Sequence, residues 1–198
     1  KHTRPHDILS IHNQETAAED EFFEKGTGDF EAMYQRMNVP KSEVHGTGGN
    51  AIHYHLPQMP SNRTLLVHNT FTSRADIDFA HAQHKDLYWC LCPNANVYIE
   101  NNLPNVELFI GANARVTLGT DSLASNHQLS ILAEMQTLQQ KKRVAFDELL
   151  KWATMNGAEF LGISNQYGSF EVGKTPGVNL IELCEAKIIK SKNVKRLV

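Results

Sequence analysis

The chain has 198 residues, of which 41% are hydrophobic and 21% charged, and its formal net charge is −3. This composition is typical of a globular protein with one sizeable core, and it excludes a disordered chain. The slight acidic excess provides no basic field for holding phosphates, so we expect no nucleic-acid partner.

Cysteine content and hydropathy exclude two further classes. Three cysteines do not make a disulfide framework, which indicates a reducing compartment, and we expect the cytoplasm. No apolar stretch approaches the roughly 20 residues that a membrane-spanning helix requires, and no signal peptide is visible. We therefore expect no membrane association. Because the first residue is Lys1 rather than Met, the natural start is expected upstream.

Short β-branched runs alternate with longer helical patterns along the chain, as in successive strand–helix units around a parallel sheet. Four strands are predicted, at residues 8–11, 64–67, 87–90 and 114–118. Helices are predicted at residues 17–24, 29–37, 73–84, 103–112, 128–140 and 145–156, the last one ending at Gly157. Loops are expected at residues 46–60 and directly after the third strand, a turn at 168–174, and a further strand at 179–183.

Four units of this kind make an α/β fold, either as a small open sheet or as half of an eight-stranded barrel. The abrupt opening of the chain just upstream of a strand favours the half barrel. Half a barrel leaves unpaired strand edges and apolar inner faces, so we expect another chain or a missing half to cover them.

Polar residues follow three of the predicted strands: His12 and Glu15 after the first, His68 after the second and Asp121 after the fourth. In a parallel α/β sheet, the carboxyl ends of the strands form the ligand-binding edge. A neutral imidazole suits zinc or iron, and a carboxyl group whose pKa is raised by burial can transfer a proton. A buried aspartate needs a metal, a cation or backbone donors.

Each of these residues also has a structural interpretation. The H-x-x-E spacing of His12 and Glu15 is compatible with a polar loop or a helix cap. His68 is compatible with a hydrogen-bonded core histidine, and Asp121 with the N-cap of the following helix. The occurrence of all four residues after strands of one sheet favours a site, because chance alone would rarely place such residue types at the same edge.

Several segments carry a family resemblance: SIHNQET at residues 10–16, LVHN at 66–69, CPNAN at 92–96 and, above all, LGTDSLASN at 118–126. They resemble the amidohydrolase superfamily, specifically its cytosine deaminase and chlorohydrolase-like branch. LKWATMNGA at 150–158 is similar to a late helix of that branch, and GSFEVGK at 168–174 to its return into a β-sandwich.

The resemblance implies that residues 1–165 form the second half, strands five to eight, of a (β/α)8 TIM-type barrel. Residues 166–198 would be a short carboxyl-terminal β segment that belongs to a β-sandwich. His12 and Asp121 would be ligands of one divalent metal ion, zinc or iron, and His68 would contact the attacking water. Asp121 and His68 would take the proton of that water, and Glu15 would protonate a ring nitrogen of the substrate.

The implied function is hydrolytic deamination of a small-molecule, purine-like aminated heterocycle. The resemblance also implies that the first four strands and an HxH pair of metal ligands are missing. We therefore expect this fragment to be inactive alone, to lack the metal in isolation, to pair with the missing N-terminal half of the same protein, and to form a homo-oligomer. Two alternatives stay open: dehalogenation of the chlorohydrolase type, and a non-catalytic α/β binding or assembly module.

Other candidate ligands are weaker. His53 and His55 have HxH form but lie in the expected loop, where a solvated or edge-strand position is the favoured interpretation. For Cys90 and Cys92 we expect alternate faces of an extended strand, so that the two thiols do not share an ion, with Cys90 in the core and Cys92 at the strand mouth. Ala95 stands where the family usually has a small polar residue, which weakens the case for substrate contact there. The family usually has an Asp after the late Gly-Lys turn, and this chain has Pro176 and Gly177 around that position.

Overall fold

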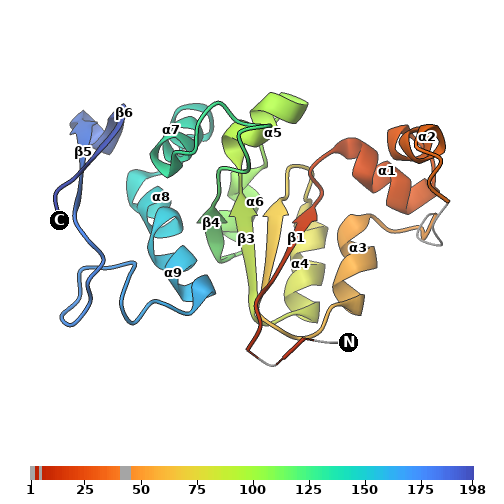
Figure 1. Ribbon diagram of the computed structural model, residues 1–198, viewed down its shortest axis with the longest axis horizontal. Helices are drawn as coiled ribbons and strands as arrows, with labels where there is room; N and C mark the ends of the chain where they lie inside the picture. The colour runs from red at the N-terminus through yellow and green to blue at the C-terminus, as the bar shows by residue number, and fades with distance from the viewer. Residues whose placement is uncertain (1–2, 5, 41–45) are drawn as a thin grey trace.

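The computed structural model describes residues 3–4, 6–40 and 46–198, apart from the side chain of Lys192. Its main feature is a four-stranded parallel sheet with the spatial order β1-β2-β3-β4 (Figure 1). These strands are β1 (Leu9–Asn13), β2 (Thr64–His68), β3 (Leu87–Leu91) and β4 (Val116–Leu118). All four predicted strands are confirmed, and the sequential order of parallel neighbours establishes successive strand–helix units.

The strands are held in a register that brings their carboxyl ends to one edge of the sheet. His12 of β1 lies opposite Val67 of β2, and Val67 lies opposite Cys90 of β3. All five residues of β3 are buried, as expected for a strand covered on both faces. Figure 1 shows the strands pointing to the same side, where α1 and α5 also lie.

Helices cover one face of this sheet and form the main hydrophobic core with it. Trp89 and Leu91 of β3 pack there with Phe109, and Trp152 is 1% exposed in the same core. Among the helices that contribute to this core are α4 (Arg74–Gln83), α6 (Val106–Gly111), α7 (Ile131–Lys142) and α8 (Phe146–Ala153). The opposite face carries a smaller cluster with Cys90, Cys92 and Ala95, against which Leu65 and Val67 pack.

Two segments that we expected to be loops are helical. The 46–60 segment contains α3 (Ala51–His55) and the 3₁₀ turn η1 (Leu56–Gln58), because the Asn50 side chain accepts a hydrogen bond from the His53 N–H and Ile52 is fully buried. The segment after β3 is α5 (Pro93–Glu100), which begins at Pro93. Proline suits the first turn of a helix, since the N–H that it lacks would have no intrahelical partner there.

The predicted helix at 145–156 is divided in two. Thr154 leaves helical geometry with φ −132° and ψ −76°, so that α8 ends at Ala153 and α9 (Met155–Leu161) follows. Gly157 therefore lies inside α9 and is not a stop. The stop is Gly162, whose φ of 72° is the left-handed conformation that glycine adopts without steric cost.

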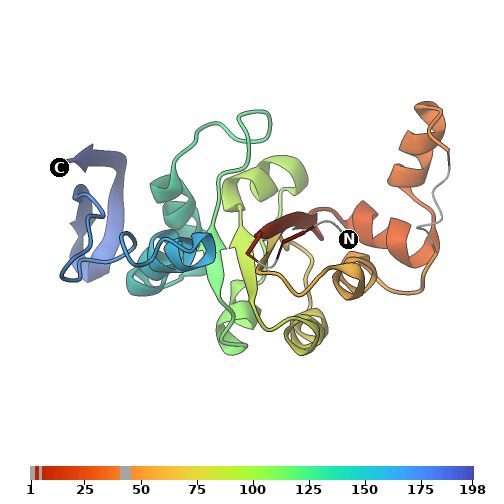
Figure 2. The ribbon, with the colours of Figure 1, turned by 60° about the horizontal axis from the view of Figure 1, so that its bottom comes forward.

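The ends of the molecule carry elements outside the main sheet (Figure 2). At one end, α1 (Ala17–Lys25) and α2 (Asp29–Arg36) follow β1. At the other, β5 (Asn179–Cys184) confirms the predicted strand and pairs antiparallel with β6 (Ile188–Arg196), which we did not predict; η2 (Glu185–Lys187) joins them. The Gln136 amide donates to the Ile189 carbonyl, which attaches β6 to α7. In the described part of the chain, every helix is too short or too polar to span a lipid bilayer.

Candidate active site and metal centre

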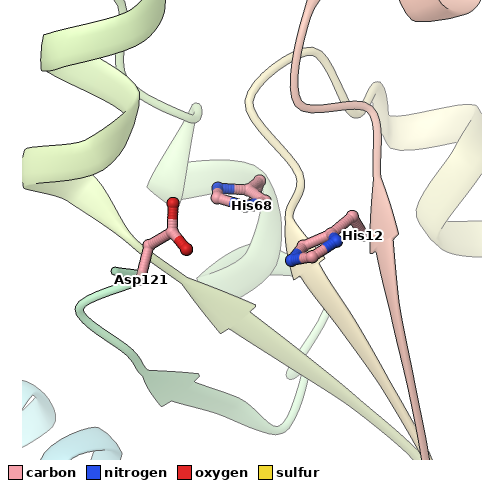
Figure 3. A group of neighbouring side chains, drawn as sticks. All are labelled: His12, His68 and Asp121. Carbon is pink, nitrogen blue, oxygen red and sulfur yellow. The ribbon is translucent and has the colours of Figure 1, made fainter. Parts of the chain in front are cut away.

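Three side chains from three strand ends converge at the carboxyl edge of the sheet. His12 lies on β1, His68 ends β2, and Asp121 follows β4 by three residues (Figure 3). One potential ligand atom from each lies within 4.8 Å of the others, and the two imidazole rings have centroids 5.2 Å apart. In the described part of the chain, this is the one group of three or more His, Cys, Asp or Glu side chains that could hold a metal ion.

The backbone at the end of β2 directs His68 toward this group. Strict alternation would place His68 on the same side as Leu66, in the helix-covered core. Instead, His68 has φ 76° and Asn69 has φ 57°, so the chain turns as the strand ends. The Asn69 side chain holds this turn by donating to the carbonyls of Leu66 and Cys90, at 2.8 and 3.3 Å.

His68 is a buried imidazole in contact with a carboxylate. It is 1% exposed, its Nε2 lies 3.5 Å from Oε1 of Glu15, and its Nδ1 lies 3.3 Å from Nδ2 of Asn96 on α5. Burial, and secondarily the neighbouring His12, lowers the pKa of His68 to about 4, although Asp121 opposes this shift. The ring is therefore neutral at pH 7, which is the form that binds metals or accepts a proton.

Glu15 lies at the rim of the site, with 26% of its side chain exposed. Burial raises the pKa of Glu15, His12 opposes the shift, and the charges of Asp121 and Glu100 add to it. The helix-cap interpretation of Glu15 is wrong, because the N-cap of α1 is Thr16, whose side chain accepts from the Glu19 N–H. A carboxyl group with a raised pKa is suited to carry a proton near neutral pH.

Asp121 occupies a left-handed backbone position with φ 55°. Partial burial works to raise the pKa of Asp121, but hydrogen bonds from the Ser125 hydroxyl and the Ser122 N–H outweigh it, and the net pKa is lowered. The N-cap interpretation of Asp121 is wrong, because Ser130 caps the following helix. Asp121 is thus an ionised carboxylate beside two imidazoles, a donor set that suits a divalent cation such as zinc.

Sequence reasoning gave no role to the polar residues that support this site. Glu134 of α7 is fully buried, accepts from the Asn94 N–H at 2.8 Å, and accepts from the Asn126 amide at 2.8 Å. The Asn126 amide also donates to the carbonyl of Thr120, next to Asp121. The adjacency of Asn69 to His68, and of Asn126 to the Asp121 segment, was the available signal for two of these residues.

His53 and His55 are not part of the three-residue group. Both lie on α3 rather than on an edge strand, and side chains two positions apart on a helix point in different directions. Nδ1 of His53 is 2.7 Å from the Asn50 side-chain oxygen, whereas the His55 ring packs 4.8 Å from the Phe23 ring, and burial lowers its pKa. These contacts account for both rings without a metal.

The expectation that Cys90 and Cys92 point to opposite faces is wrong, because residues two apart on a strand share a face. A Cβ atom added to Gly119 would lie 2.8 Å from the Cys90 sulfur and 3.2 Å from the Cys92 sulfur, so both thiols border the same point. The core position of Cys90 is confirmed, and Cys92 is 1% exposed. The contact with Cys90, together with burial, raises the pKa of the Cys92 thiol, which therefore stays protonated. Ala95 is fully buried against this pair.

This fold and this group define an α/β protein with its site at the carboxyl ends of parallel strands. Residues 9–198 match the family model described as the amidohydrolase family, and the chain belongs to that family. An adenosine deaminase from Helicobacter pylori is 30% identical over 171 residues, which are 84% of this chain and 41% of that protein. The chain thus spans less than half the length of this relative.

Two crystal structures extend the comparison. Helicobacter pylori aminofutalosine deaminase superposes with a TM-score of 0.75 and 26% identity, over 93% of this chain and 46% of that one. An adenosine deaminase from Xanthomonas campestris, crystallised with bound zinc, superposes with a TM-score of 0.60 and 23% identity, over 89% of this chain and 37% of that one. The second likeness is one of fold alone.

Proposed function

We propose that this chain is the carboxyl-terminal half, strands five to eight, of a (β/α)8 TIM-type barrel in a metal-dependent hydrolase of C–N bonds. Its reaction is the hydrolytic deamination of an aminated, purine-like heterocycle. Support comes from family membership, from four sequential parallel strands, and from relatives named as deaminases of which the chain spans 41% and 46%. The division into a barrel part (1–165) and a β segment (166–198) belongs to the same proposal.

The single observation that carries the site is the convergence of His12, His68 and Asp121 within 4.8 Å, with Glu15 beside His68. Two imidazoles and an ionised carboxylate fit one divalent ion, zinc or iron, with His12 and Asp121 as its ligands on this chain. When bound, such an ion lowers the pKa of a water molecule so that it attacks at neutral pH.

The remaining chemistry falls to side chains of this chain. Neutral His68 and ionised Asp121 orient the attacking water and accept its proton. Glu15, whose pKa is raised by burial, protonates a ring nitrogen of the substrate and recovers a proton from the attacking oxygen as the carbonyl forms. The proton that His68 and Asp121 accepted passes to the amine, which leaves as ammonia. The contact between Glu15 and His68 places the two proton-transferring groups beside each other.

The test compares the 198-residue chain with the full-length product of its gene. Both are assayed for bound metal and for ammonia release from a panel of aminated purine nucleosides, purines and pyrimidines. We expect only the full-length protein to hold the ion and release ammonia. Release of halide from chlorinated heterocycles in place of ammonia would establish the chlorohydrolase alternative. A full-length protein with neither metal nor turnover would establish a non-catalytic module.

Association is proposed on the same grounds. Among the residues that the structure describes, β1 and β4 each have one neighbour in the parallel sheet, so one edge of each strand is open there. Open strand edges are covered in stable proteins, and the missing N-terminal half of the same protein is the partner that a closed barrel requires. A homo-oligomer of the full-length protein stays a prediction, to be measured by sedimentation.

A further inference from the structure

Gln14 is a fully buried residue in the loop that carries Glu15, and all four hydrogen-bonding positions of its amide are used. Its Oε1 accepts from the Thr72 hydroxyl at 2.7 Å and from the Asn13 amide at 3.3 Å. Its Nε2 donates to a carboxylate oxygen of Asp20 at 3.1 Å and to one of Asp76 at 3.5 Å. An amide that uses two donors and two acceptors is completely satisfied.

The chemistry of the neighbours determines the orientation of this amide. Asp20 and Asp76 present carboxylate oxygens, which only accept hydrogen bonds, so the nitrogen of Gln14 must face them. The hydroxyl of Thr72 must then donate to the oxygen of Gln14. Neither a carboxylate nor an apolar side chain at position 14 reproduces this pattern, because one end must donate and the other must accept.

The backbone of Gln14 strengthens the same connection. Gln14 has φ 48°, a left-handed conformation that costs a non-glycine residue energy and persists when its surroundings enforce it. Its carbonyl accepts from the Phe71 N–H, and the carbonyl of Asn13 accepts from the Asn69 N–H. The loop before Glu15 is thus joined to the loop after His68 by both main chain and side chain.

The network extends to α3 through the two carboxylates. Asp20 accepts from the Ala51 N–H at 3.2 Å, and Asp76 accepts from the Asn50 amide at 2.8 Å. Asp76 also forms the capping box of α4 with Ser73. The Gln14 amide therefore contacts α1 and the 72–76 segment directly, and it is linked to α3 through the two carboxylates.

We propose that Gln14 is a positioning residue that fixes the Glu15 carboxyl group against His68 and so sets the rate of proton transfer to the substrate. The inference rests on the proposed function. Glu15 is the next residue along the chain, and its Oε1 is 3.5 Å from Nε2 of His68. Gln14 bonds to Phe71 and Thr72, in the loop that follows His68, so it joins the two loops that carry these side chains. A misplacement of a reacting group by about 1 Å lowers a rate by about 100-fold. Holding the Glu15 loop in one position should therefore raise kcat above that of a folded protein in which this loop is free to shift.

The test uses the full-length protein loaded with metal. Gln14→Met keeps the length of the side chain but removes all four hydrogen bonds. We expect kcat to fall by about 100-fold while KM changes by less than about threefold and bound metal is retained. Gln136→Met is the matched control, because Gln136 is also a buried, hydrogen-bonded glutamine. Its amide donates to the Ile189 carbonyl, and it lies on α7 beside β6. The kcat of Gln136→Met should stay within twofold of wild type.

A polarity exchange separates positioning from folding. Gln14→Glu places a carboxylate against Asp20, whereas Asp20→Asn in the same chain supplies a donor and still accepts from the Ala51 N–H. We expect the double variant to recover at least tenfold in kcat over Gln14→Glu alone. If Gln14→Met does not fold, Thr72→Val takes its place in the test, because it removes only the hydrogen bond from Thr72 to Gln14. For Thr72→Val we expect kcat to fall by about fivefold while KM is unchanged.

The outcomes are distinct for the two proposals. If wild-type protein releases no ammonia from any substrate, the deaminase proposal fails and the role of Gln14 fails with it. If wild type is active but Gln14→Met, or Thr72→Val in its place, keeps wild-type kcat, only the positioning role is overturned. The same holds if the polarity exchange restores thermal stability without restoring kcat.

Discussion

The Nε2 atom of His68 lies 3.5 Å from Oε1 of Glu15, although the two residues belong to different strand–helix units. The parallel register of β1 and β2 and the left-handed turn at His68 and Asn69 produce this contact. Burial acts on the two groups in opposite senses, because it disfavours charge on each: it lowers the pKa of His68 to about 4 and raises that of Glu15. A proton shared by this pair therefore favours Glu15 over His68 more than it would for the same two side chains in water.

Asp121→Asn in the full-length protein should lose metal. The substitution replaces an ionised ligand by a neutral one of the same shape. Changes to residues that merely support ligands cost about 10- to 100-fold in metal affinity, so loss of a ligand should exceed about 100-fold. Metal titration measures this, with His53→Ala as the control that keeps wild-type affinity. An Asp121→Asn protein that binds the ion as wild type does would remove Asp121 from the site.

Glu15→Gln should separate proton transfer from metal binding. The amide cannot donate the proton that a protonated carboxyl group donates, so we expect kcat to fall by about 10²- to 10⁴-fold. Bound metal should be unchanged, because Glu15 is not one of the proposed ligands. Steady-state kinetics and metal analysis on the same preparation provide both values. Glu182→Gln, at an exposed position of β5, should leave both values unchanged, and wild-type kcat in Glu15→Gln would contradict the role.

Glu19 should make stability depend on pH. Burial raises the pKa of Glu19 from 4.5 to about 7, against hydrogen bonds from the Glu15 and Gln14 N–H groups. Between these values the folded protein holds a proton that the unfolded chain has released, so the stabilisation is complete below pH 4.5 and is lost as the pH rises through about 7. Glu19→Gln should remove this dependence, while its amide oxygen still accepts from the Glu15 N–H.

Thermal unfolding of the full-length protein measures the Glu19 effect. The melting temperature of wild type relative to Glu19→Gln should decrease steadily from pH 4.5 to about 7. Glu182→Gln, at an exposed position of β5, is the comparison for the loss of one carboxyl group. A constant difference between wild type and Glu19→Gln across this range would show that the Glu19 carboxyl group is not perturbed.

Gly119→Ala should destabilise the sheet next to Asp121. The new Cβ would lie 2.8 Å from the Cys90 sulfur and 3.2 Å from that of Cys92, and overpacking of this kind costs about 1–3 kcal/mol. Cys90→Ala in the same chain should restore part of the loss, because it removes the nearest atom. Gly157→Ala is the matched control: an added Cβ there meets nothing within 4 Å, and alanine favours a helix. Denaturant unfolding measures wild type, the single variants Gly119→Ala, Cys90→Ala and Gly157→Ala, and the double variant. Additive losses in the double variant would contradict the contact.

Hydrophobic periodicity was sufficient to predict the parallel sheet, because alternation of short apolar runs with helical patterns is a local signal. Three of the local interpretations were wrong, each for a different reason. Burial of Ile52 and a cap from Asn50 make residues 51–55 helical within a polar, glycine-rich segment. Pro93, which we expected in a loop, starts α5, and the break at Thr154 moved the helix stop from Gly157 to Gly162.

The sequence alone determined which residue types stand at the carboxyl ends of the strands, and therefore that His12, Glu15, His68 and Asp121 were the candidates for a site. Only the tertiary structure decided that these side chains meet and what holds them there. The His68 turn, the buried amide of Gln14 and the carboxylate of Glu134 join segments far apart in the chain. Hydrogen bonds of this kind depend on the relative placement of whole elements, and no spacing within one segment encodes that placement.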